Sequence, residues 1–158
     1  MARQHNKPYV VRDLTARPLE TAEYHFDEAW LRDFIFAHYQ VLPINEIEPV
    51  FDLLIPVCTE LPCTKTGSAD ILFINDAGLL TLVECKLWKN PEARRTVVGQ
   101  ILDYAKELSR WSLDDLQRAV QDKIGKKLYD LVRENTEELD ESIFNDSSRN
   151  FSCSRYMV

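Results

Sequence analysis

The stretch SADILFINDAGLLTLVECKL, residues 68–87, decides the fold because two apolar runs meet at a turn within it. Both runs are short and rich in Leu, Ile, Val and Phe, which is typical of β-strands. Residues 76–78 supply a three-residue loop that ends in glycine, the residue that most easily adopts the left-handed conformation such loops need. The sequence therefore predicts an antiparallel hairpin in which Asn75 pairs with Leu79.

That register places Asp70 opposite Glu84 on the neighbouring strand, and opposed residues have Cβ atoms about 5 Å apart. Side chains alternate along a strand, so Lys86 shares the face of Glu84 while Cys85 points to the other face. Two carboxylates this close repel each other, and one lysine does not relieve both the repulsion and the loss of water. A divalent cation would, because Mg²⁺ is commonly held by one or two protein carboxylates together with waters and phosphate oxygens.

The same side chains also have a purely structural interpretation. An Asp at the start of a strand is often a turn cap, and a Glu two residues from a Lys is usually a solvated strand end. The apolar run 79–83 weighs against this interpretation, because a strand buried along its length is a poor carrier for an ion pair unless it ends at a site. A nucleophilic Cys85 is disfavoured, since alternation directs its thiol away from the charged groups and no histidine stands nearby in sequence.

Further elements are expected on both sides of the hairpin. Residues 25–43 predict a helix with Asp27 as its N-cap and Pro43 at its end, and its apolar residues recur at helical spacing: Trp30, Leu31, Phe34 and Ile35. Residues 50–61 predict a first strand, followed by strands at 68–75 and 79–87. The second and third strands are apolar on both faces, which is typical of central strands covered by helices on each side.

Two helices are expected after the hairpin. Asn90 and Pro91 supply an N-cap and a first helical position for a helix over 92–111, and its core-facing stripe comprises Val97, Ile101, Leu102, Ala105 and Leu108. A further helix is predicted within 112–135, with Ser112 or Asp114 as its cap. Residues 136–158 are expected to form an acidic, weakly structured tail, although FSCSRYMV at its end could begin one more strand.

Composition excludes several classes of protein. With 158 residues and 45% hydrophobic content, the chain fits one domain with a real core. A formal charge of -7 argues against a protein whose whole surface binds nucleic acid, and leaves room for a local basic patch. The four cysteines form no paired CxxC motif and no histidine cluster accompanies them, so a structural zinc site is disfavoured and free thiols are expected. The sequence contains neither a signal peptide nor an apolar run of about 18 residues, so a cytoplasmic protein without a membrane partner is expected.

The segments GSAD, VECK and VVGQILDY, in this order and with a turn between the first two, resemble the PD-(D/E)XK nuclease superfamily, which has the restriction-endonuclease-like fold. The resemblance implies an α/β fold with a central mixed β-sheet flanked by helices and an α-β-β-β-α core over residues 26–111. In that superfamily the Asp and the Glu hold Mg²⁺, and the Lys positions or activates the attacking water. Carried over, these are Asp70, Glu84 and Lys86, while Ala69 replaces the proline of the nominal motif.

The resemblance adds two outer residues. Glu28 on the first helix matches a glutamate that many members place at the metal, and on a helical wheel it lies near the inward side. It also fits a first-turn acid that is favoured by the helix dipole. Gln100 matches a helix-borne glutamine that orients the phosphate or the lysine, with a purely structural amide as the alternative. Tyr104, one turn later, is expected to be a packing residue.

A small basic patch follows the E-x-K segment. Residues 86–95 contain four basic residues and one acid, a net charge of +3, and the members expected to contact nucleic acid besides the catalytic lysine are Lys89, Arg94 and Arg95. Such a patch could bind phosphates, although exposed cations at the start of a helix are also commonplace.

The sequence therefore predicts a single nuclease-like domain over 1–158 that hydrolyses phosphodiester bonds in DNA, with Mg²⁺ as cofactor and Mn²⁺ as a substitute. The alternative is a catalytically inactive nuclease-like module that binds nucleic acid or a protein partner, and a homodimer is compatible with either. The fold usually has a fourth core strand after the second helix, and only SRYMV remains for it, so a truncation before or within that strand is expected.

Overall fold

The computed structural model describes residues 9–18, 26–63, 67–87, 93–136, 144 and 156–157, with the side chains of 93–95 and 156–157 left out. The elements in chain order are β1 (Tyr9–Arg12), β2 (Thr15–Pro18), α1 (Glu28–Ala37), the 3-10 helix η1 (Tyr39–Val41), α2 (Ile44–Ile47), the 3-10 helix η2 (Pro49–Phe51), β3 (Ile55–Pro62), β4 (Ser68–Ile74), β5 (Leu80–Val83), α3 (Ala93–Leu108), α4 (Leu113–Ile124), α5 (Leu128–Asn135) and β6 (Tyr156–Met157).

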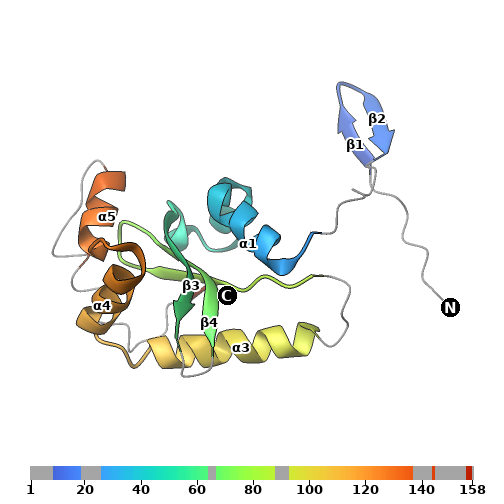
Figure 1. The fold of residues 1–158 in the computed structure, drawn as a ribbon. Coiled ribbons are helices and arrows are strands. Elements are labelled where there is room, and N and C mark those ends of the chain that lie inside the picture. Colours follow the sequence, from blue (N-terminus) through green and yellow to red (C-terminus); the bar gives the residue numbers. More distant parts are fainter. Residues whose placement is uncertain are drawn as a thin grey trace.

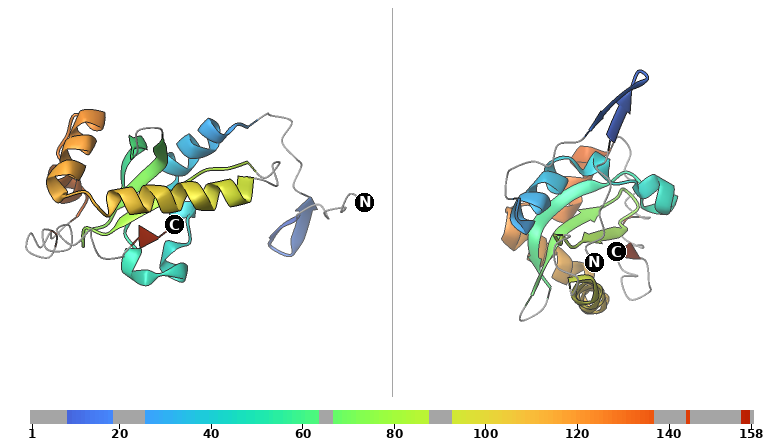
Figure 2. Two further views of the ribbon diagram at one scale, coloured as in Figure 1. Left: turned by 90° about the horizontal axis from the view of Figure 1, so that it is seen from below. Right: turned by 90° about the vertical axis from the view of Figure 1, so that its right-hand side faces the viewer.

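The central sheet lies between helices, with α1 over one face and α3 over the other (Figures 1 and 2). Its strand order is β3-β4-β5-β6; the first three strands are antiparallel and β6 runs parallel to β5. The prediction of an α/β fold with a mixed sheet flanked by helices is confirmed at this level.

The hairpin forms in the predicted register. The backbone N–H of Asn75 donates to the carbonyl of Leu79 at 3.1 Å, and Gly78 has a φ of 77°. Strand β5 ends at Val83, which pairs with Ile71, so it is shorter than the predicted 79–87. Residues 84–87 follow the strand without regular structure. Glu84 and Lys86 therefore lie just beyond the end of β5.

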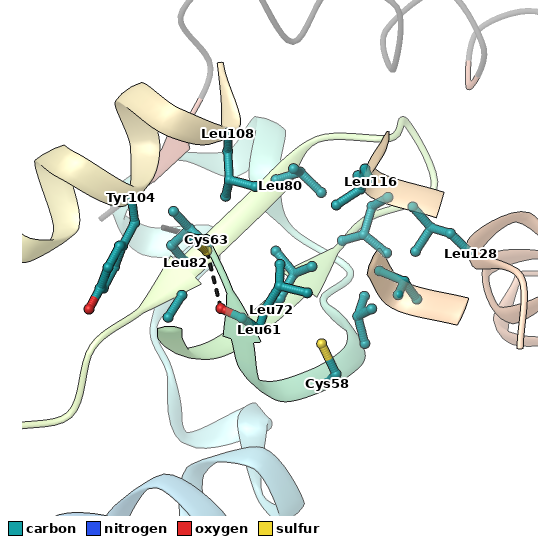
Figure 3. Packing of buried hydrophobic residues seen from close by; sticks show 14 of the residues in the cluster. Cys58, Leu61, Cys63, Leu72, Leu80, Leu82, Tyr104, Leu108, Leu116 and Leu128 are labelled. Atoms are coloured by element: carbon teal, nitrogen blue, oxygen red, sulfur yellow. Dashed lines mark hydrogen bonds between the residues drawn. The ribbon is translucent and has the colours of Figure 1, made fainter. Parts of the chain in front are cut away.

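Both faces of the sheet are buried, as two apolar clusters show. Leu72 and Ile74 of β4 pack with α3, α4 and α5, whereas Ile71 and Phe73 pack with α1 and the short helices after it. Figure 3 shows the first cluster, in which Tyr104 packs beside the leucines. The prediction of two-sided, helix-covered strands is confirmed, and so is the packing role of Tyr104, which is 6% exposed.

Two predicted element boundaries and one predicted core residue are wrong. The first helix ends at Ala37, well before Pro43, because His38 leaves helical geometry and a 3-10 turn follows. The first strand begins at Ile55, since residues 49–51 form η2. In α3, Leu102 is 58% exposed and does not belong to the core-facing stripe, whereas Ile101 and Leu108 are buried.

The helix predicted within 112–135 is in fact two helices. Ser112 caps the first of them through a capping box with Asp115. Gly125 ends it in the left-handed conformation, with a φ of 71°, and α5 begins three residues later at Leu128. A single helix is excluded because the left-handed residue turns the chain away from the first helix axis.

The segment 136–158 lies largely outside the described residues. Of its described part, Phe144 is fully buried in the core cluster beside Tyr129, and β6 pairs with Leu80 and Thr81. The prediction of a weakly structured tail is therefore wrong for Phe144. A further strand, β6, is present in the segment FSCSRYMV and adds two described residues to the sheet; the predicted truncation of the core stays a prediction. Among the helices of the described residues, none is long and apolar enough to span a membrane.

Candidate metal and phosphodiester site

Asp70 lies at the open end of the β4–β5 hairpin, where it is hydrogen-bonded to the segment after β5. Its position in β4 immediately precedes the Ile71–Val83 pair, which places it beside the first residues after β5. The backbone N–H of Cys85 donates to Asp70 Oδ2 at 2.7 Å. This bond fixes the Asp70 carboxylate against the segment that carries Glu84 and Lys86.

Lys86 joins the segment after β5 to helix α1. Its Nζ lies 3.0 Å from Glu84 Oε1 and 3.2 Å from Glu28 Oε2. The backbone N–H of Leu87 also donates to Glu28 Oε1, at 3.4 Å. The N-cap of Asp27, whose carboxylate accepts from the Trp30 N–H at 2.7 Å, starts α1 at the position that brings Glu28 to the lysine. The structure thus brings together Glu28, Asp70, Glu84 and Lys86.

Glu84 is more deeply buried than Lys86 and Glu28, since its side chain is 3% exposed. Burial raises the pKa of Glu84 above its ordinary value; the hydrogen bond with Lys86 opposes this rise, and the charge of Asp70 adds to it. Glu84 Oε2 is shielded from solvent and has no hydrogen-bond partner. A buried carboxylate oxygen without a partner is costly, so this atom is the part of the site that most needs a cation.

Lys86 remains a cation at neutral pH. Burial by itself would lower the pKa of Lys86, but its hydrogen bonds to Glu84 and Glu28 outweigh burial and raise it. A lysine in this state donates hydrogen bonds and stabilises negative charge, but it does not accept a proton. Lys86 therefore suits the support of a water or phosphate oxygen and does not suit general base catalysis.

Cys85 is chemically inert between these groups. Its thiol is in the cluster on the α1 side of the sheet and the residue is 2% exposed. Burial, followed by the negative charges of Asp70 and Glu84, raises the pKa of Cys85 to about 12. The thiolate is the nucleophilic form, so the structure agrees with the prediction that a nucleophilic role of Cys85 is disfavoured.

The donor set fits a hard cation held by two carboxylates. Asp70 and Glu84 are close enough for the charge of one to raise the pKa of the other, and Glu84 Oε2 is available. Both oxygens of Glu28 are engaged by Lys86 and Leu87. Within the described residues, no group of three or more His, Cys, Asp or Glu is arranged to hold a metal ion. Of the three predicted ligands, Asp70 and Glu84 are the two whose position and free oxygen fit Mg²⁺, and the ligand roles of all three stay predictions.

Gln100 lies on α3 and is not hydrogen-bonded to the acids. Its side-chain oxygen is buried and has no hydrogen-bond partner. Together with Tyr104 it lines a hollow of about 360 Å³. Burial, followed by the charge of Glu84, raises the pKa of the Tyr104 hydroxyl, which places this face of α3 near the acids. The predicted role of Gln100 in orienting a phosphate or Lys86 stays a prediction.

The basic patch falls where the structure gives no side chains. Lys89 lies outside the described residues, and Arg94 and Arg95 are in α3 with backbone alone described. Their predicted contact with nucleic acid therefore stays a prediction.

Arg32 is a charged residue of this region that the sequence did not single out. It lies one helical turn after Glu28, and its Nη1 is 2.5 Å from Glu60 Oε1 on β3. The pKa of Arg32 is raised, first by its hydrogen bond to Asp33 and further by the charges of Glu60 and Asp70. The spacing of four residues from Glu28 was the available signal, because such residues share one helix face.

No protein-family model, no curated protein sequence and no solved structure matches this chain. The geometry of the residues, together with the resemblance of their motif, is therefore the basis for assigning a function.

Proposed function

We propose that this protein is a metal-dependent nuclease that hydrolyses phosphodiester bonds in DNA. The observation that carries the proposal is the buried, unpartnered Glu84 Oε2, which lies beside a second carboxylate and a cationic lysine. An ion pair alone would leave this oxygen without compensation, whereas a divalent cation would satisfy it. The order Asp, then Glu-x-Lys across one hairpin supports the PD-(D/E)XK interpretation and its implied substrate.

Each side chain has a distinct role in the proposal. Asp70, oriented by the Cys85 N–H, and Glu84, oriented by Lys86, would hold the cation. Bound there, Mg²⁺ would polarise a phosphoryl oxygen and lower the pKa of a bound water. Lys86, kept protonated by two carboxylates, stabilises the attacking oxygen or the developing charge on the phosphate. Glu28 holds the lysine in place from α1.

The experiment is a cleavage assay on supercoiled, linear and single-stranded DNA, with Mg²⁺, with Mn²⁺ and with EDTA. Wild-type protein is compared with Asp70→Ala and Lys86→Ala, and with the controls Asp130→Ala and Lys127→Ala, which change exposed residues of the same types at α5. We expect metal-dependent cleavage that falls by roughly 10²–10³-fold in each site variant and is unchanged in the controls.

Two outcomes contradict the proposal. One is cleavage that persists in both site variants, which would indicate a contaminating nuclease or another site. The other is DNA binding that survives the substitutions while no protein sample cleaves any substrate, which would instead support an inactive nuclease-like module.

A further inference from the structure

The hairpin of β1 and β2 stands away from the rest of the molecule. All eight of its strand residues are exposed, and Figure 1 shows the hairpin beyond the N-terminal end of α1, apart from the central sheet. An isolated two-stranded hairpin is marginally stable in water. A hairpin held clear of its own core is therefore suited to contact a partner.

The two faces of this hairpin differ in chemistry. Tyr9 pairs with Pro18 and Arg12 pairs with Thr15, which fixes the register of the whole ribbon. Paired residues share a face, and successive residues alternate. One face thus comprises Val10, Arg12, Thr15 and Arg17, and the other Tyr9, Val11, Ala16 and Pro18. The first face is polar and carries both arginines of the hairpin.

The polar face is also the hollowed one. A hollow of about 550 Å³ is lined by Val10, Arg12, Asp13, Thr15 and Arg17. Because Arg12 pairs with Thr15, Arg17 is its diagonal cross-strand neighbour, and such neighbours lie about 7–8 Å apart. This separation is comparable with that of successive phosphates along one nucleic-acid strand. The lining holds two cations and one acid, Asp13, so its net charge is positive, and this concave ribbon fits a convex polyanion.

Both arginines are available for a ligand. Within the described part of the chain, neither Arg12 nor Arg17 forms an ion pair, whereas several other cations are already neutralised by acids. Examples are Arg32 with Glu60, Lys86 with Glu84, and Lys126 with Glu134. Since the chain as a whole carries a charge of -7, DNA needs a local cationic contact to overcome repulsion.

We propose that the β1–β2 hairpin is an arm that binds the phosphate backbone of duplex DNA next to the Asp70–Glu84 site. The inference rests on the proposed function and names the partner of that site. Glu28 is ten positions after Pro18 in the sequence, so the chain between them spans at most ~35 Å. The arm is therefore tethered within reach of a duplex that lies on the acids, and a two-stranded ribbon is narrow enough to enter a major groove.

The test measures binding of a short fluorescent duplex by anisotropy, in EDTA, over a series of salt concentrations. The double variant Arg12→Ala/Arg17→Ala is compared with Lys127→Ala/Arg133→Ala, which removes the same charge from exposed residues of α5 at the opposite end of the molecule. We expect Kd to rise about tenfold in the arm variant, with the slope of log K against log salt reduced by about 2. The α5 control keeps the wild-type Kd and slope.

A charge-preserving variant guards against a folding artefact. Arg12→Lys/Arg17→Lys should retain most of the affinity, and thermal unfolding should be the same in all variants because the arm is outside the core. Equal Kd values in the arm variant and wild type would overturn the proposal, as would absence of duplex binding by the wild type. A change of oligomeric state by sedimentation, without a change of Kd, would assign the arm to a second copy of the chain instead.

Because EDTA prevents metal-dependent cleavage, this test is independent of catalysis. If binding depends on the arginines but the protein never cleaves DNA, the proposal that the hairpin binds DNA is kept and the proposed nuclease activity is contradicted. If cleavage depends on Lys86 and neither binding nor cleavage depends on the arginines, the nuclease proposal is kept and the hairpin proposal is contradicted.

Discussion

Glu84 illustrates at the residue scale how a side chain can be paired and still be unfavourable. Its Oε1 lies 3.0 Å from a lysine, yet its pKa is raised, because burial outweighs the attraction of Lys86. The other oxygen has no partner. A carboxylate kept in this state reduces the stability of the folded protein, and such a cost is typical of residues retained for function.

This cost predicts a pH-dependent stability that Glu84→Gln removes. The folded-state pKa is raised above the ordinary value of 4.5, so the folded chain binds more protons than the unfolded chain between these two pKa values. Stability therefore falls as pH rises through that window and stays reduced above it. In EDTA at neutral pH, we expect Glu84→Gln to melt at a higher temperature than wild type, with the difference vanishing below the window.

The measurement is a series of thermal melts from acid to neutral pH, with Glu46→Gln, an exposed residue of α2, as the control. A wild-type protein more stable than Glu84→Gln at neutral pH would mean that the ion pair with Lys86 outweighs burial.

At the scale of elements, two glycines in the helical region differ in backbone conformation: one needs the left-handed conformation and the other lies in regular helix. Gly125 ends α4 with a φ of 71°, while Gly99 lies inside α3, and a Cβ at either position would meet nothing within 4 Å. Backbone conformation alone therefore decides the effect of substitution. We expect Gly125→Ala to destabilise the protein by about 1 kcal/mol and Gly99→Ala to stabilise it by up to about 1 kcal/mol.

Urea unfolding monitored by circular dichroism measures both changes. The two variants control for each other, since each adds one methyl group in open space. A shift of the same sign in both would show that solvation or the unfolded chain dominates over backbone geometry.

The elements also show what the sequence could and could not predict. The hairpin register followed from a glycine in a three-residue loop, and it placed Asp70 beside the residues after β5. The β1–β2 hairpin was missed because Asp13 and Leu14 form its turn, with φ values of 50° and 61°. Such turns are normally signalled by Asn-Gly or Asp-Gly. Gly125 lies inside the segment predicted as one helix, and its left-handed conformation, which divides that segment, was not predicted.

For the candidate site, the local sequence pattern predicted some features, whereas others depend on tertiary packing and could not be predicted. The burial of Cys85 in the cluster on the α1 side of the sheet agrees with the local sequence pattern. That Glu84 and Lys86 share one face stays a prediction, because residues 84–87 lie beyond β5 and Lys86 also contacts Glu28 on α1. The contact of Lys86 with Glu28 links residues 58 positions apart. Its geometry depends on how α1 docks on the sheet, and periodicity does not specify docking.

At the scale of the whole molecule, Phe144 belongs to the main core cluster although it is far along the chain from the central strands. The residue is fully buried and packs edge-on against Tyr129, with ring centroids 5.9 Å apart. The core position of Phe144 was not predicted because the residues around it in the sequence are mostly acidic or polar. Phe144→Ala should destabilise the protein by about 3–5 kcal/mol, since it leaves a cavity in a closed core.

Phe34→Ala is the matched control because the same side chain is 39% exposed on α1, and we expect it to cost about 1 kcal/mol or less. Chemical denaturation gives both values. A cost for Phe144→Ala as small as that of the control would show that the segment around it contributes little to the folded state.

The candidate site depends on the whole fold, because β4, the end of β5 and α1 must all be in place to bring Asp70, Glu84 and Lys86 together. Binding of Mn²⁺ to the DNA-free protein, measured by the electron paramagnetic resonance signal of the free ion, tests this arrangement directly. We predict saturable binding by wild type and its loss in both Asp70→Asn and Glu84→Gln, with binding retained in Asp130→Asn on α5. Equal Mn²⁺ affinity in wild type and the two site variants, or no binding by wild type at all, would contradict a cation held between these carboxylates.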